Sequence, residues 1–134
     1  MKYMLDTNIC IYILNNKPVE YLDRLKKIEK NHSIFISSIV VSELQYGIAR
    51  SQRKEQNQNN VNALLSRLEV LDYSASCAKY YGEIRASLQK KGVIIGGNDL
   101  FIASHAVYED AVLVTNNTKE FRRINNLKLE DWSL

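Results

Sequence analysis

Short apolar runs alternate with stretches of helical periodicity along the chain. The apolar runs predict strands at residues 2–5, 33–36, 69–73 and 111–115, with an edge strand near 127–129. Between them, apolar side chains recur every three or four positions, which is typical of amphipathic helices. Helices are therefore expected near residues 7–15, 18–28, 39–48, 74–91, 96–107 and 119–123. This alternation predicts an α/β fold in which helices flank a central, mostly parallel sheet of about four to five short strands.

Two segments interrupt this pattern without dividing it. Residues 51–60 are strongly polar and fit a solvated helical arm or loop before apolar periodicity resumes at Val61. Gly92 is expected to end the long helix at 74–91 as its C-terminal cap. No repeat, linker or low-complexity tract is present, so residues 1–134 are expected to form a single domain.

Composition narrows the class of protein only slightly. The chain has 134 residues, 46% of them hydrophobic and 25% charged, which are the values of an ordinary globular domain. A net charge of +3 is too small to indicate a nucleic-acid binder by itself. Cys10 and Cys77 lie in apolar helical patterns without a second ligand nearby, so we expect small core residues of a reduced protein. No signal peptide or membrane span is apparent, and a cytoplasmic location is expected.

Asp6 ends the first predicted strand, just before a helix. In an open α/β sheet, a residue at this place points into the crevice where ligands bind. Asp and Thr are also common N-caps, so Asp6 or Thr7 can instead satisfy the free N–H groups of the helix. Taken alone, Asp6 is explained more simply as a cap, and a role as a ligand requires companions elsewhere in the chain.

Two further acids are candidate companions. Asp99 opens a helix and shares one face with Ala103 and Ala106, whose small side chains let the helix approach a strand closely; a first-turn acid favoured by the helix dipole is the alternative. Glu43 borders the buried stripe of its helix, although glutamates are mostly solvated. Gly47, one turn later, costs about 1 kcal/mol relative to alanine, which suggests that something passes close to the helix beside Glu43.

Polar residues also follow the strand at 111–115. Thr115 and Asn117 offer side chains to the same crevice as Asp6, and Glu120 adds another carboxylate. Asn, Thr and Glu are equally common in turns and caps, so both interpretations stay open here. Carboxylates gathered in one crevice repel each other unless a cation neutralises them. Mg²⁺, or Mn²⁺, suits oxygen ligands, and it activates water and stabilises charge on a phosphodiester.

Four stretches resemble, in order, the successive motifs of PIN-domain ribonucleases. More narrowly, they resemble the VapC toxins of bacterial type II toxin–antitoxin pairs, and the match continues to Glu130-Asp131-Trp132. The stretches are MLDTNICIY at 4–12, SS through EL and YG at 37–47, IGGND through ASHA at 95–106, and VTNNTKEF at 114–121.

The resemblance implies a Mg²⁺-dependent endoribonuclease. Its acidic core would be Asp6, Glu43 and Asp99, with Asp6 and Asp99 as the principal metal ligands. Many PIN domains carry a further aspartate after the fourth strand, where this chain has two asparagines, and Glu120 is the possible substitute. The implied contacts to substrate or water are Thr7, Asn8, Thr115 and Asn117.

The resemblance also implies partners. The branch of the family that this chain most resembles cleaves initiator tRNA in the anticodon stem-loop and is held inactive by a VapB antitoxin; a homodimer and the absence of membrane attachment are implied as well. Basic side chains are available for phosphates, although solvated surface is the default for each of them. They are Arg50, Arg53, Lys54, Arg85, Lys90, Lys91, Lys119, Arg122 and Arg123.

Several alternatives compete with this interpretation. A phosphoryl-transfer site of the haloacid-dehalogenase type requires a second aspartate two residues after Asp6, where this chain has Asn8. Metal-independent RNA cleavage needs histidine acid–base chemistry, for which His32 and His105 are the only candidates. A non-catalytic binding partner with structural acids, or a metal-dependent phosphodiesterase acting on DNA or other RNA, also remains open.

Overall fold

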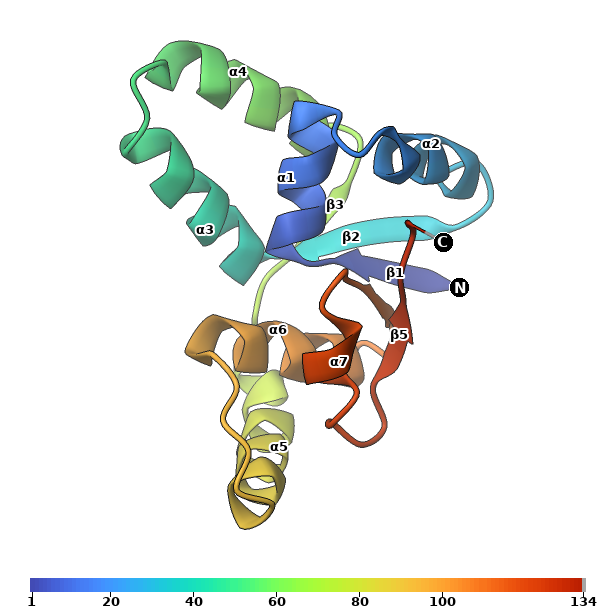
Figure 1. The fold of residues 1–134 in the computed structure, drawn as a ribbon, viewed down its shortest axis with the longest axis vertical. Helices are drawn as coiled ribbons and strands as arrows, with labels where there is room; N and C mark the ends of the chain where they lie inside the picture. Colours follow the sequence, from blue (N-terminus) through green and yellow to red (C-terminus); the bar gives the residue numbers. More distant parts are fainter. Residues whose placement is uncertain (134) are drawn as a thin grey trace.

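The computed structural model describes residues 1–133; Leu134, the last residue of the expected domain, lies outside the described residues. A five-stranded sheet in the order β3-β2-β1-β4-β5 forms the centre of the molecule (Figure 1). All four strand pairs are parallel. The strands are β1 (Lys2–Leu5), β2 (Ser33–Ser37), β3 (Glu69–Leu71), β4 (Val112–Val114) and β5 (Lys128–Glu130).

The first strand occupies the middle of the sheet. Tyr3 of β1 is in register with Ile34 of β2 on one side and with Val112 of β4 on the other. The central strands are almost wholly buried, as expected for a parallel sheet covered on both faces. The carboxyl ends of β1, β2 and β4 consequently meet at one edge of the sheet, where the chain turns into helices.

Helices cover both sides of this sheet. Figure 1 shows α1, α2 and α4 on one side and α5, α6 and α7 on the other. The helices are α1 (Thr7–Asn15), α2 (Val19–Ile28), α3 (Ser38–Ala49), α4 (Lys54–Leu65), α5 (Ala78–Lys90), α6 (Gly97–Tyr108) and α7 (Thr118–Phe121), with a 3₁₀ turn, η1, at Ala75–Cys77. The α/β fold with a central parallel sheet, expected from the sequence pattern, is confirmed. No helix within residues 1–133 is long and apolar enough to cross a membrane.

Three local expectations need correction or refinement. The helix expected over residues 74–91 is divided, because η1 ends at Cys77 before α5 begins at Ala78. The strand expected over 69–73 ends at Leu71. The polar arm is α-helical from Lys54 onward, continuous with the apolar positions that follow. Gly92 does follow the end of α5, with the positive φ of 70° that glycine adopts without strain.

Candidate active site

Asp6 is both a helix cap and a member of the site. It directly follows β1 and is only 4% exposed, and its Oδ1 accepts a 2.9 Å hydrogen bond from the backbone N–H of Ile9 in α1. Thr115, which follows β4, also hydrogen-bonds the Asp6 side chain. The pKa of Asp6 is raised to about 6, mainly by burial and in smaller part by the negative charges of Asp99 and Glu43. Capping therefore accounts for one contact of this carboxylate and does not exclude a ligand role.

Asp99 lies in the first turn of α6 and is half-buried. Ala103 and Ala106 on the same helix are fully buried, so this face of α6 packs closely against the core, as the small side chains predict. The pKa of Asp99 is raised to about 6, mainly by burial, with the charges of Glu120 and Glu43 contributing. The packing of α6 thus holds Asp99 within electrostatic reach of acids on two other elements.

Glu43 extends from α3 into the same region. It is half-buried, and its charge acts on both Asp6 and Asp99. No segment within residues 1–133 is the close neighbour that Gly47 suggested, because nothing there lies within 4 Å of where its Cβ would stand. Gly47 instead lines an open groove beside Glu43.

The segment after β4 supplies the remaining polar groups. The hydroxyl of Thr115 is fully buried and accepts a 3.0 Å hydrogen bond from the backbone N–H of Asn117. The amide of Asn117 donates a 2.5 Å hydrogen bond to Oε2 of Glu120, whose charge acts on Asp99. Asn116 donates a 2.8 Å hydrogen bond to the hydroxyl of Tyr12, which ties this segment to α1.

A groove of about 580 Å³ extends from this edge between α1, α3 and α4. Thr7, Asn8 and Glu43 contribute to its lining. The structure therefore brings all eight residues singled out in the sequence to one edge of the sheet and the adjoining groove. Sequence reasoning did not single out Asn98 or Tyr46, which also line the groove; the available signal was the position of Tyr46 one helical turn after Glu43.

The site fits a divalent cation held by few protein ligands. The charge of Glu43 raises the pKa of both Asp6 and Asp99, and the hydroxyl oxygen of Thr7 is buried without a hydrogen-bond partner within residues 1–133. In that same part of the chain, no three acid, histidine or cysteine side chains converge to form a complete metal cage. Mg²⁺-type sites commonly use one or two carboxylates and keep several waters, which matches the pair Asp6 and Asp99.

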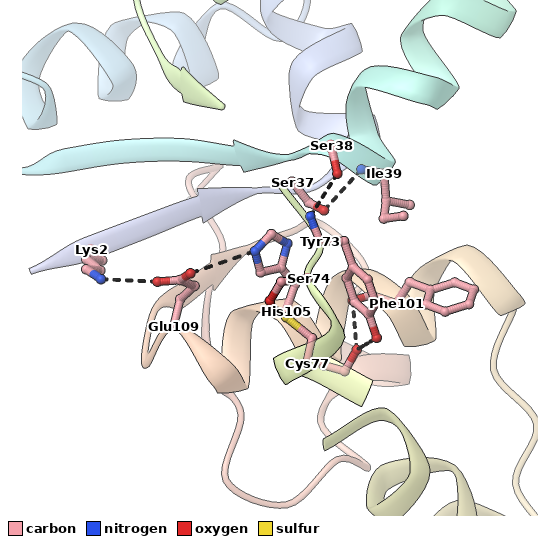
Figure 2. Close-up of polar contacts among 11 residues, drawn as sticks. Lys2, Ser37, Ser38, Ile39, Tyr73, Ser74, Cys77, Phe101, His105 and Glu109 are labelled. Carbon is pink, nitrogen blue, oxygen red and sulfur yellow. Dashed lines mark hydrogen bonds and ion pairs between the residues drawn. The ribbon is translucent and has the colours of Figure 1, made fainter. Parts of the chain in front are cut away.

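Neither histidine is placed for acid–base cleavage of RNA. Figure 2 shows His105 in the core beside Tyr73, and its ring is 0% exposed. Its Nε2 lies 3.9 Å from Oε2 of Glu109, and burial lowers the pKa of His105. His32 is exposed and lies beside Met1, at the opposite edge of the sheet from Asp6. The metal-independent alternative therefore has no reachable catalytic base among these two side chains.

The parallel sheet and the acids gathered beside its carboxyl edge define a nuclease domain of the PIN type. The sequence profile of the PIN domain matches residues 3–127. Ribonuclease VapC2 of Rickettsia felis is 59% identical over 132 residues, 98% of both chains. The tRNA(fMet)-specific endonuclease VapC of Shigella flexneri is 43% identical over 133 residues, 99% of both chains. The chain belongs to the VapC family of PIN-domain ribonucleases.

A solved structure agrees with this assignment. The crystal structure of VapBC2 from Rickettsia felis bound to a DNA fragment from their promoter contains a chain that matches this one with a TM-score of 0.95. The two are 58% identical, and the match covers 98% of this chain and 99% of that chain. The resemblance to VapC toxins stated from the sequence is thereby confirmed. PIN-domain nucleases use divalent metal ions, which agrees with the chemistry of the acidic site.

Proposed function

We propose that this chain is the toxin component of a type II toxin–antitoxin pair and acts as a Mg²⁺-dependent endoribonuclease. Its proposed substrate is initiator tRNA, cut in the anticodon stem-loop. The observation on which the mechanism rests is the convergence of Asp6, Glu43 and Asp99 at one edge of the sheet, where the charge of Glu43 acts on both aspartates and the charge of Asp99 acts on Asp6. The substrate is supported by the 43% identical Shigella flexneri relative, which is named a tRNA(fMet)-specific endonuclease.

Asp6 and Asp99 would hold Mg²⁺, with Mn²⁺ as the alternative ion. The bound ion would activate a water molecule and stabilise charge on the phosphodiester during in-line displacement. Thr115 orients Asp6 through its hydroxyl, and the Ile9 N–H fixes one oxygen of that carboxylate. Asp6 is thus held in place by contacts that do not depend on the metal.

Glu43 and Glu120 complete the proposed acidic core. Each lies close enough to affect Asp99, and neither has a basic partner within the described part of the chain. In our proposal Glu43 orients or deprotonates the attacking water, and Glu120, held by Asn117, takes the place of the usual fourth acid. Thr7, Asn8, Thr115 and Asn117 are proposed to contact the substrate or its bound water.

The proposal includes partners and location. Relatives of this chain have been solved as VapBC assemblies, which supports a VapB-like antitoxin as the cognate inhibitor. A homodimer, a cytoplasmic location and action as a single domain over residues 1–134 are further parts of the proposal. The groove beside the acids is open to solvent.

The test is cleavage of purified initiator tRNA by protein freed of any antitoxin. Wild-type protein with Mg²⁺ is expected to cut within the anticodon stem-loop, and excess chelator is expected to stop cleavage. Asp99→Asn is expected to lower kcat by at least about a hundredfold, the scale of losing a key electrostatic group in an active site. Thermal unfolding and antitoxin capture serve as controls that the variant is folded.

Each other outcome points to a different conclusion. Full activity in Asp99→Asn, or in excess chelator, contradicts the metal mechanism. Cleavage of single-stranded DNA in preference to tRNA favours the alternative phosphodiesterase. If wild-type protein with metal cuts no nucleic acid, the chain is a binding partner whose acids are structural.

A further inference from the structure

Tyr46 exposes its aromatic ring on the surface of α3. It lies on α3, one turn after Glu43, and 67% of its surface is accessible. An apolar ring on a helix normally packs toward the core, as Leu44 and Ile48 on the same helix do. The ring of Tyr46 instead borders the groove that begins at Glu43.

A positive charge lies behind this ring. The guanidinium carbon of Arg50 lies 5.4 Å from the centroid of the Tyr46 ring, within the range of a cation–π contact. The contact orients the ring, while the high exposure of Tyr46 leaves ring surface free. Gly47 lies between the two residues in sequence and leaves space, because nothing within residues 1–133 lies within 4 Å of its Cβ position.

The rest of the groove offers hydrogen bonds. Five asparagines from α1, α4 and α6 line it, and across residues 1–133 none of their side-chain amides has a hydrogen-bond partner. They are Asn8, Asn15, Asn57, Asn60 and Asn98. An amide has both a donor and an acceptor, which match the edges of unpaired bases.

The charges suit a nucleic acid strand that runs from the acids along α3. Glu43 and Arg50 are separated by seven residues, about 10 Å along a helix. Arg53 and Lys54 are exposed just beyond Arg50. Arg50 lines the groove, so a backbone phosphate at that end would meet positive charge, whereas the scissile phosphate would lie at the acidic end.

From these observations we infer that Tyr46, backed by Arg50, is a stacking subsite for an unpaired RNA base on one side of the scissile phosphodiester. The inference rests on the proposed ribonuclease function and adds a residue that selects single-stranded substrate. Aromatic rings bind bases of any sequence by stacking, and they cannot stack on bases that remain paired within a duplex. The subsite consequently favours cleavage in a loop over cleavage in a stem.

Steady-state cleavage of initiator tRNA tests the role in catalysis. Tyr46→Ala is expected to raise KM about tenfold, within the range that base stacking contributes, and to change kcat little. Tyr46→Phe retains the ring and is expected to restore the wild-type KM. The matched control is Tyr108→Ala, which removes a 40% exposed tyrosine at the far end of α6, packed against Tyr80, and is expected to leave KM unchanged.

Binding can be measured without cleavage. In the Asp99→Asn background, an anticodon stem-loop RNA with 2-aminopurine in the loop is titrated with protein, and stacking on Tyr46 is expected to quench its fluorescence. Tyr46→Ala is expected to weaken binding about tenfold and to abolish the quench. Because this assay needs no activity, it tests the subsite even if the proposed cleavage is not observed.

Two results overturn the inference. One is an unchanged Kd for the RNA in Tyr46→Ala. The other is a Tyr46→Ala variant that loses antitoxin binding but keeps RNA binding, which would assign the groove to a protein partner. In either case, wild-type tRNA cleavage with Mg²⁺ leaves the proposed function intact. Thermal unfolding of each variant excludes misfolding as the cause.

Discussion

Asp6 shows how one side chain has two roles at once. Its Oδ1 caps α1 through Ile9, and its carboxylate also belongs to the acidic site. The sequence made these roles look like alternatives, since an aspartate before a helix is explained by capping alone. A carboxylate has two oxygens and several lone pairs, so a single N–H leaves capacity for a cation. Only the positions of Asp99 and Glu43 showed that the second role was available.

His105 is the residue whose protonation opposes folding most directly. Both ring nitrogens are buried without a hydrogen bond, and burial lowers the pKa of the imidazole. Glu109 and Asp72 act in the opposite direction, and Lys2 in turn pairs with Glu109. The unfolded chain therefore binds a proton more readily than the folded chain below about pH 6.5.

We expect His105→Leu to flatten the loss of stability that the wild type shows as the pH falls below about 6.5. At neutral pH the variant is expected to be at least as stable, since leucine fills similar space and leaves no unpaired nitrogen. Glu109→Gln is expected to steepen the loss, because it removes a charge that favours the imidazolium. Urea unfolding between pH 5 and pH 8 measures both effects, and identical pH profiles for all three proteins would contradict this account.

At the scale of elements, α6 determines where the second aspartate lies. Its buried face carries Ala103 and Ala106, and the helix packs against β4 and α3. Larger side chains there would push the helix outward and move Asp99 away from the sheet edge. The spacing of small residues predicted this close packing from the sequence, which is why Asp99 was a credible site residue before its neighbours were known.

The substitution Ala103→Leu is expected to lower the free energy of unfolding by about 1–3 kcal/mol, the cost of overpacking a tight interface. It is also expected to weaken Mg²⁺ binding, because Asp99 is one turn away on the same helix. Ala86→Leu on the exposed face of α5 is the matched control and is expected to change stability little. Denaturant unfolding and metal titration give the two values; equal stability of the two leucine variants would show that α6 is not tightly packed.

Elements with strong periodicity were predictable from the sequence, whereas their interruptions were not. The bounds of α1 and β1 follow from a run of apolar residues that Asp6 ends. The break between η1 and α5 at Cys77 leaves no mark in the apolar pattern, because a 3₁₀ turn and an α-helix bury similar positions. The open groove beside Gly47 was also unpredictable, since an isolated glycine fits a close neighbour as well as an empty space.

At the scale of the whole molecule, a net charge of +3 conceals a local excess of negative charge. Asp6 and Asp99 each have a pKa raised from 3.8 to about 6. Between these two pH values the folded protein binds more protons than the unfolded chain, so the contribution of these two groups to stability falls as the pH rises from 4 to 7. In the metal-free protein, Asp6 and Asp99 therefore contribute least to the stability of the folded state at neutral pH.

Mg²⁺ is therefore expected to raise the Tm at pH 7.5. A hundredfold excess over Kd stabilises the folded state by about 2.7 kcal/mol. At pH 5, where both carboxyl groups are largely protonated, the Mg²⁺-induced rise in Tm is expected to be a small fraction of the rise at pH 7.5. Asp99→Asn is expected to show little shift at either pH. Differential scanning calorimetry measures all four conditions, and an equal Mg²⁺ effect at both pH values would place the ion elsewhere.

The central position of β1 has a consequence for the timing of synthesis. Residues 2–5 are synthesised long before one of their two neighbours in the sheet, β4, at residues 112–114. Thr115, which hydrogen-bonds Asp6, follows β4, and its backbone N–H donates a 3.1 Å hydrogen bond to Glu130 in β5, the outermost strand. During synthesis, Asp6 is therefore present long before β4 and β5 can complete the edge of the sheet around it. The edge of the sheet around Asp6 is therefore complete only after β5, at residues 128–130, has been synthesised.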